Sequence, residues 1–323
     1  MDSKMKALLH LATEHSTNTG DVEIDPMKTE WLNTVLKEGC IDLTKQLAED
    51  LDTMDKLLSN SAYSESDMLP VLDDILSLTE DINLANDFYK MSGMKLVNRL
   101  LFTAPDNLKN YGYRIVANTT QNNEYGQNVC LSDNLLQELL LMIQKEVDVC
   151  RLKYVLLAVS CLTRNNDAAI QLFKENNGFF IVFDSMQRML SNSDNEGTSE
   201  FGAFWNKAAF MIYCLLPDFI KDSTMEAKTK FAENLVSIIA ARTQPQEYLL
   251  RSLVLLLSNG SLDMDVISSE KDVVISRDLW IELLRKESLR QLASWLQLHD
   301  DKDDTSETLE VLQCIRILKQ LIS

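Results

Sequence analysis

The sequence predicts an all-α protein in which helical units repeat and stack along the chain. Only 9 glycines and 5 prolines occur in 323 residues, too few for the many turns of a β-sandwich. Leucine and methionine recur at spacings of three and four residues from Leu43 to Leu58, which is the apolar stripe of one helix. From Leu69 onward the chain repeats a pattern of helices separated by short polar breaks. These observations favour a helical solenoid.

The first 67 residues are predicted to be an N-terminal helical region that includes a mobile segment. A short amphipathic helix is expected over residues 5–12, followed by a polar stretch over 15–25. A longer helix is predicted over 42–58 because of its apolar stripe. The polar residues 60–67 are expected to form a loop.

Residues 68–262 are predicted to form the repeat domain. Matching Phe88, Val129 and Phe173 gives periods of 41 and 44 residues. These periods are typical of armadillo and HEAT repeats, at roughly 40–47 residues. We expect about four repeats, the fourth beginning near Trp205, and a degenerate fifth beginning near Gln246. A polar insertion at 191–200 precedes the fourth.

The turns of the repeats contain residues suited to begin and end helices. Asn166 or Asp167 is predicted to cap the helix that follows, because a short side-chain oxygen can accept a free N–H of the first turn. Gly178, after Asn177, is predicted to end the preceding helix in the left-handed conformation, and Gly93 to do the same in the first unit.

Residues 263–323 are predicted to form C-terminal capping helices. A solenoid needs such helices because its last repeat would otherwise expose an apolar face. The acidic residues 300–304 are expected to form a solvated turn before a final amphipathic helix that begins near Ser306.

The charge of the chain argues against nucleic acid as a partner. The formal net charge is −18, of which −11 lies in residues 1–80 and −7 in residues 81–323. An acidic surface repels phosphate backbones. The repeats are closer to neutral, so they remain available to a protein partner.

No arrangement of residues predicts an enzyme. The three histidines show no metal-ligand spacing, and the sequence contains no nucleophile elbow, phosphate-binding loop or dinucleotide-binding loop. The six cysteines include no C-x-x-C pair and are expected to be reduced thiols. We therefore predict no metal and no cofactor.

No segment approaches the roughly 18 apolar residues of a membrane helix, and the N-terminus lacks a signal-peptide core. The chain is expected in the cytoplasm or nucleus, without a membrane partner.

The expected shape of the solenoid directs attention to one face. Stacked three-helix repeats curve, and their third helices line a concave side that suits a rounded partner. Polar residues near the ends of these helices are candidates for binding that partner. They are Asn118, Asn122, Arg164 and Lys207.

Three segments carry a resemblance to a known family. They are EDINLANDFYKMSGMKLV, RLKYVLLAVSCLTRNNDAAIQLFKENNGFFIVFDSMQ and NKAAFMIYCLL. These segments resemble the armadillo-type nucleotide exchange factors of heat-shock-70 chaperones, which comprise the animal heat-shock-70-binding proteins and their fungal Fes-type relatives. The N-terminal ALLHLATEHSTNT is also similar to the opening of that family. The resemblance covers nearly the whole chain and is most specific in the first three repeats.

The resemblance implies a co-chaperone that is not an enzyme, with an armadillo-like right-handed superhelical solenoid. Its concave face would embrace one lobe of the chaperone's nucleotide-binding domain so that ADP escapes. Two contact positions of the family fall on Ala85, where a small side chain permits close approach, and on Lys207, where a cation can pair with a carboxylate. We include Asn86 beside Ala85 among the predicted partner-binding residues, and we expect a monomer.

Two other functions remain open alongside this one. The first is a generic armadillo adaptor that binds an extended peptide in its groove. Such adaptors use a regular ladder of Asn and Trp, but here Cys161 stands where the second repeat has Asn118, and Trp205 is the one Trp between Leu69 and Asp218. The second is a lumenal Sil-type exchange factor, which would require a signal peptide and a retention tail.

One feature of the resembled family is missing. The fungal members carry a Gly-rich N-terminal segment, whereas residues 13–30 of this chain are polar and acidic.

Overall fold

A computed structural model describes residues 42–60, 63–191, 197–242, 246–258, 287–298 and 314–319. The predicted helix over 5–12, the acidic turn at 300–304 and the predicted start of the last helix lie outside the described residues. The described part of the chain contains helices and no strand, and the all-α prediction is confirmed. None of its helices combines the length and the apolar character that a membrane span requires.

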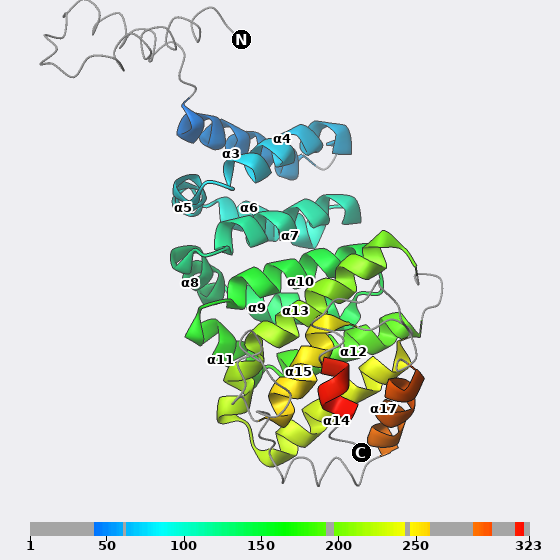
Figure 1. The fold of residues 1–323 in the computed structure, drawn as a ribbon. Coiled ribbons are helices and arrows are strands. Elements are labelled where there is room, and N and C mark those ends of the chain that lie inside the picture. Colours follow the sequence, from blue (N-terminus) through cyan, green and yellow to red (C-terminus); the bar gives the residue numbers. More distant parts are fainter. Residues whose placement is uncertain are drawn as a thin grey trace, which may run out of the picture.

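The described helices form three complete three-helix repeats with a helix pair at each end. Figure 1 shows them stacked one above another from α3 to α14. The first pair is α3 (Leu43–Ser59) and α4 (Glu65–Leu78), and the second pair is α14 (Met225–Ala241) and α15 (Glu247–Leu257). The helix α17 (Glu287–Leu298) packs on α14, and residues 314–319 are also helical.

The three repeats share one design, in which a short first helix is followed by two longer ones. The first helices have nine residues each. The repeats comprise α5 (Ile82–Lys90), α6 (Gly93–Thr103) and α7 (Asp106–Thr120); α8 (Glu124–Ser132), α9 (Leu135–Lys145) and α10 (Val149–Thr163); and α11 (Asp167–Glu175), α12 (Gly178–Leu190) and α13 (Ser199–Asp222).

Two rows of helices build the solenoid. The third helices pack in the order α4, α7, α10, α13 and α15, each against the next. The second helices line the other side, where α3 packs on α6, α9 on α12 and α12 on α14. One apolar core runs between the rows through all repeats, and it includes fully buried Phe88, Phe173, Phe183, Phe204 and Trp205.

Several helix ends agree with the sequence prediction and two differ from it. Asp42 caps α3 by accepting a hydrogen bond from the Lys45 amide, so the helix predicted over 42–58 is confirmed. The predicted loop over 60–67 is wrong at its end: Ser64 caps α4, which begins at residue 65. Trp205, near which a fourth repeat is predicted to begin, lies inside α13, the last helix of the third repeat, which Thr198 caps.

The repeat period differs by one residue from the predicted one. The first helices are capped by Asp81, Asn123 and Asn166, each of which accepts hydrogen bonds from amides of the first turn. These caps are 42 and 43 residues apart. Counted from the caps, Phe88 and Phe173 correspond to Cys130, which is fully buried like them, and the predicted match to Val129 is wrong.

The glycines at the start of the second helices have a different role from the predicted one. Asn177 takes the left-handed conformation, with φ 56°, and Gly178 is the first residue of α12. A Cβ atom on Gly178 would lie closer than 3.0 Å to the ring of Phe173. Ser92 and Gly93 repeat this arrangement against Phe88. The glycines therefore serve close packing of an aromatic ring, and the preceding polar residue makes the turn.

Candidate functional site

The exposed side of the third-helix row forms one continuous surface, which we call the third-helix face. Direct contacts connect its helices one to the next. Asp73 of α4 reaches Tyr111 of α7, and Tyr111 lies near Tyr154 of α10. Further along, rings and cations of α10, α13 and α15 lie against one another. The face is made of partly exposed residues, namely Tyr111, Arg114, Asn118, Lys153, Tyr154, Cys161, Arg164, Lys207, Phe210, Tyr213, Cys214, Tyr248 and Arg251, together with the exposed Asp73.

Cations of this face lie over aromatic rings. The Arg114 guanidinium is 5.3 Å from the centre of the Tyr111 ring, and the Lys153 ammonium is 4.8 Å from that of Tyr154. Arg164, at the end of α10, lies 5.0 Å over the ring of Phe210 on α13. A cation within about 6 Å of a ring centre is attracted to the ring and held in place.

The predicted residue Lys207 lies on the third-helix face, in α13. It extends from α13 toward Cys161 and Lys153 of α10. Burial lowers the pKa of Lys207; the Cys161 thiol opposes this effect and the Lys153 ammonium adds to it. The two lysines lie on adjacent third helices, near enough for the charge of Lys153 to act on Lys207.

The predicted residue Arg164 shares this surface with Lys207, while Asn118 lies one repeat earlier. The Asn118 side-chain amide donates a hydrogen bond of 3.1 Å to the carbonyl oxygen of Leu76 in α4. Arg164 presents its guanidinium to the ring of Phe210, and its main-chain carbonyl accepts a hydrogen bond from Gln127. Asn118 thus also ties two repeats together.

The remaining predicted residues belong to the junctions with the first helices. Ala85 is 1% exposed, in the first turns of α5. Asn86 is partly exposed and accepts a hydrogen bond of 2.9 Å from the Asn123 amide. Asn122 is exposed and takes the left-handed conformation with φ 53°. A partner would therefore find Asn122 accessible, whereas Ala85 faces the core.

A ladder of buried amides joins consecutive repeats at these junctions. Asn123 donates to Asn86 and to the Thr119 carbonyl, both at 2.9 Å. At the next junction, Gln127 donates to the carbonyls of Cys161 and Arg164, and Asn166 donates to Gln127 at 3.2 Å. Because buried amides need partners, this ladder fixes how one repeat sits on the next.

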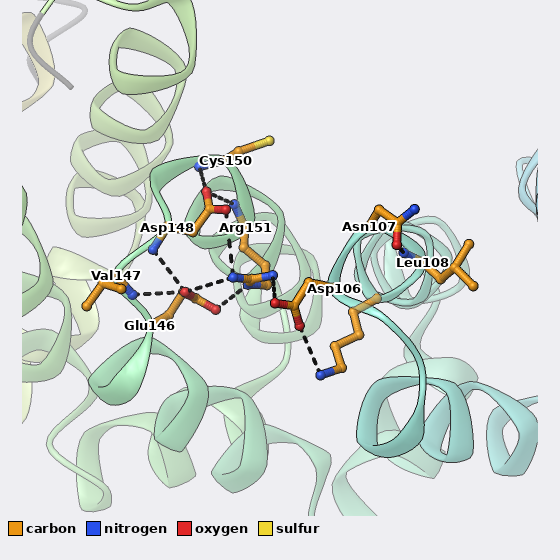
Figure 2. A network of polar contacts seen from close by, with 9 residues as sticks. Asp106, Asn107, Leu108, Glu146, Val147, Asp148, Cys150 and Arg151 are labelled. Atoms are coloured by element: carbon orange, nitrogen blue, oxygen red, sulfur yellow. Dashed lines mark hydrogen bonds and ion pairs between the residues drawn. The ribbon is translucent and has the colours of Figure 1, made fainter. Parts of the chain in front are cut away.

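A second polar network joins the starts of α7 and α10. Figure 2 shows the Arg151 guanidinium between the carboxylates of Glu146 and Asp106. Arg151 lies 2.8 Å from Asp106, and Glu146 also accepts bonds of 2.9 Å from the amides of Val147 and Asp148. Burial would raise the pKa of Glu146, but these hydrogen bonds hold it below its usual value. The network joins the start of α7 to the start of α10, and the carboxylates of Asp106 and Glu146 are both paired with Arg151.

The described residues contain no group of three or more His, Cys, Asp or Glu side chains that could hold a metal ion. The five described cysteines form no disulfide bond with one another. All three histidines and Cys40 lie outside the described residues. The third-helix face is therefore the candidate functional site.

Comparison with known proteins identifies relatives over almost the full chain. No protein-family model matches the sequence. Hsp70-binding protein 1 of Homo sapiens is 23% identical over 323 residues, which cover 95% of this chain and 84% of that protein. The same protein of Rattus norvegicus is 23% identical over 324 residues, with the same coverage. The chain is similar to Hsp70-binding protein 1. The resemblance seen in the sequence is confirmed, because these relatives and the repeat fold agree with it.

Solved structures confirm the armadillo fold. A designed armadillo repeat protein covers 86% of this chain, with a TM-score of 0.54 and 11% identity, and all of that protein is matched. A second designed armadillo repeat protein, in complex with the peptide (KR)4, covers 88% of the chain and is matched over its whole length, with a TM-score of 0.55 and 13% identity. At these identities the likeness concerns the fold alone.

The sequence prediction of the site missed the aromatic partners of the cations. Tyr111, Arg114 and Asn118 are spaced by three and four residues, as are Lys207, Phe210 and Cys214. Such spacing places three side chains on one side of a helix. The periodicity could have identified these two groups, but it could not have shown that they lie on neighbouring parts of one surface.

Proposed function

We propose that this chain is a nucleotide exchange factor of a heat-shock-70 chaperone. It would bind the nucleotide-binding domain of the chaperone through the third-helix face and promote release of ADP. The observation that carries the proposal is the similarity to Hsp70-binding protein 1 over 95% of the chain. In this proposal the chain is a binding protein and not an enzyme. The monomeric state and the location in the cytoplasm or nucleus stay predictions.

The third-helix face supports the proposal by its extent and its composition. It crosses five helices, from α4 to α15, and it presents rings and cations side by side. Aromatic residues and arginine are enriched at protein interfaces, because they combine large contact area with directed polar groups. A folded lobe of a chaperone offers a surface of suitable breadth, since a stable interface buries about 800 Å² per partner.

Linkage between the two ligands of the chaperone defines the mechanism. If bound chain lowers nucleotide affinity about 100-fold, the coupling free energy is about 2.7 kcal/mol. Nucleotide must then weaken binding of the chain by the same factor. ATP at cellular concentration would accordingly release the exchange factor and complete the cycle.

Release of a fluorescent ADP analogue from an Hsp70 chaperone tests the proposal. The complex is mixed with excess unlabelled ATP in a stopped-flow instrument, with and without the chain. We expect a rate that rises with the concentration of the chain until it saturates. An unchanged rate at saturating concentration would contradict the proposal.

The alternative of a peptide-binding adaptor is less well supported. An adaptor ladder requires asparagine amides that are free to bind a peptide backbone. The amide of Asn118 already donates to the Leu76 carbonyl within the protein, and the next repeat has Cys161 at the matching place. A partner captured on the chain and released by ATP would distinguish a chaperone from a peptide ligand.

A further inference from the structure

The central part of the third-helix face holds four cations that form no ion pair with a described carboxylate. They are Arg114, Lys153, Arg164 and Lys207. Arg99, Arg151 and Lys174, on other parts of the molecule, each lie within 4.0 Å of an Asp or Glu. The four share one surface, and aromatic rings lie against three of them.

We infer that this cationic centre binds an acidic surface of a folded protein partner, whose carboxylates pair with Arg114, Lys153, Arg164 and Lys207. The inference deepens the proposed function and relies on it only for the identity of the partner. The resemblance already implies that Lys207 can pair with a carboxylate; the inference adds Arg114, Lys153 and Arg164 to it as one acid-binding surface.

The aromatic rings prepare the cations for such pairing. Arg114, Lys153 and Arg164 each lie over a ring, so less side-chain freedom is lost when a carboxylate arrives. The ring leaves the outer N–H groups free, because it engages the face of a guanidinium or one side of an ammonium. Lys207 contributes differently: it is partly buried in α13, near enough to Lys153 to be affected by its charge, and a carboxylate bound there would offset the repulsion between the two cations.

Acidic residues on both sides of the cationic centre limit where the acidic surface of a partner can lie. Asp73 borders it at the α4 end, and Glu247, which pairs with Arg251, borders it at the α15 end. The pKa of Glu200 is lowered by its hydrogen bonds to Ser199 and to its own backbone and, to a smaller extent, by the charge of Lys153. Lys153 and Glu200 nevertheless form no ion pair. The acidic partner surface must therefore be confined to the width of α7, α10 and α13.

A protein surface fits this arrangement better than nucleic acid does. Nucleic acid presents one negative charge per phosphate along its whole length, and it would run into the acidic borders and the acidic remainder of the chain. A folded protein can place a few carboxylates against the cations and neutral or basic groups against Asp73 and Glu247.

The test compares the double variant Lys153→Gln/Lys207→Gln with Lys230→Gln. Lys230 is a matched control, because its ammonium lies 4.6 Å from the centre of the Phe180 ring but belongs to α14 in the second-helix row. Both variants and the wild-type full chain are titrated with nucleotide-free Hsp70 at two salt concentrations. Equal thermal unfolding of all three chains shows that the substitutions act on binding.

We expect the double variant to bind at least about tenfold more weakly than wild type at low salt, and the control to bind equally well. We also expect the difference between wild type and double variant to shrink at high salt, because salt screens exposed charges. Equal affinity of the double variant and wild type would overturn the inference while leaving the proposed function intact.

If the wild-type chain does not bind Hsp70, the proposed function fails and a second probe tests the face alone. The probe is a fluorescent ten-residue glutamate peptide. Binding to wild type that the double variant loses supports the inference, and absence of binding overturns it. Tighter binding of a single-stranded oligonucleotide than of the glutamate peptide would also overturn it.

Discussion

The side-chain nitrogen of Gln127, in α8, lies 2.9 Å from the main-chain carbonyl oxygen of Arg164 at the end of α10. The same nitrogen also donates to the carbonyl of Cys161, and the side-chain oxygen of Gln127 accepts from Asn166. The buried Gln127 side chain thus provides hydrogen-bond partners both for carbonyls at the end of α10 and for Asn166, which caps α11. The junction between the two repeats depends on it.

Replacement of Gln127 by leucine should therefore destabilise the protein. The variant leaves carbonyls of Cys161 and Arg164 without their partner, which we expect to lower the free energy of unfolding by about 2–3 kcal/mol. Urea unfolding followed by circular dichroism measures the change. Gln121→Leu is the matched control, because Gln121 is exposed at the end of α7. Equal midpoints for the two variants would show that the junction does not need the amide.

Gly178→Ala should destabilise the third repeat through steric overlap. The added Cβ would lie closer than 3.0 Å to the ring of Phe173, which is fully buried and packs edge-to-face against Phe179. We expect a loss of about 1–3 kcal/mol, which is typical of overpacking. Gly202→Ala, in the helix α13, has nothing within 4 Å of the new methyl group and should instead stabilise by about 0.5–1 kcal/mol. Thermal melting of the two variants should move in opposite directions; a shared direction would contradict the packing argument.

Ala85→Arg should unfold part of the first repeat. Ala85 is 1% exposed, so the long charged side chain would have to enter the core or displace α5. We expect the melting temperature to fall and binding to the partner to fall with it. Asn83→Arg adds the same charge at an exposed position of the same helix and should leave both unchanged. A stable Ala85→Arg variant that has lost binding would assign Ala85 to the partner contact itself.

Arg151→Met should remove stability that depends on pH. The pKa of Glu146 lies below its usual value of 4.5 in the folded protein, so its carboxylate adds stability above that pH. This contribution is lost as pH falls through the lower, folded pKa. We expect the variant to be less stable than wild type by about 2 kcal/mol near pH 7, and the difference to shrink below about pH 4.

Urea titrations between about pH 7 and pH 3 measure that difference. Lys45→Met tests whether the effect belongs to the buried network, because Lys45 forms an exposed pair with Glu49. We expect a change below about 0.5 kcal/mol for this variant at every pH. A difference between wild type and Arg151→Met that does not vary with pH would place the role of Arg151 in packing instead.

The sequence was sufficient to predict the repeats because local patterns encode them. The stripe of α3, the cap Asn166 and the alternation of short and long helices each depend on residues a few positions apart. The start of α4 was missed because Ser64 and the acidic first turn resemble a polar loop until the cap hydrogen bond is seen. The matching of Val129 was wrong because a buried Cys130 gives a weaker signal than a buried Phe.

The candidate site was less predictable, because it depends on how repeats stack. Asn118 and Lys207 lie in third helices and Arg164 directly follows one, but their role in binding a partner stays a prediction. Sequence spacing could not show that Ala85 faces the core, since a small residue suits both close approach by a partner and tight packing. The pairing of Arg164 with Phe210 joins helices more than 40 residues apart, and no local pattern reports it.

The packing of the first helix against the second occurs in two forms within one chain. The first and third repeats combine Phe88 with Gly93 and Phe173 with Gly178, while the second combines Cys130 with Leu135 five positions later. A large residue at the first position accompanies the smallest at the second, and a small residue accompanies a large one. Exchange of a single member would create either a clash or a void, so a lineage can pass from one form to the other only through a less stable protein or by changing both residues together.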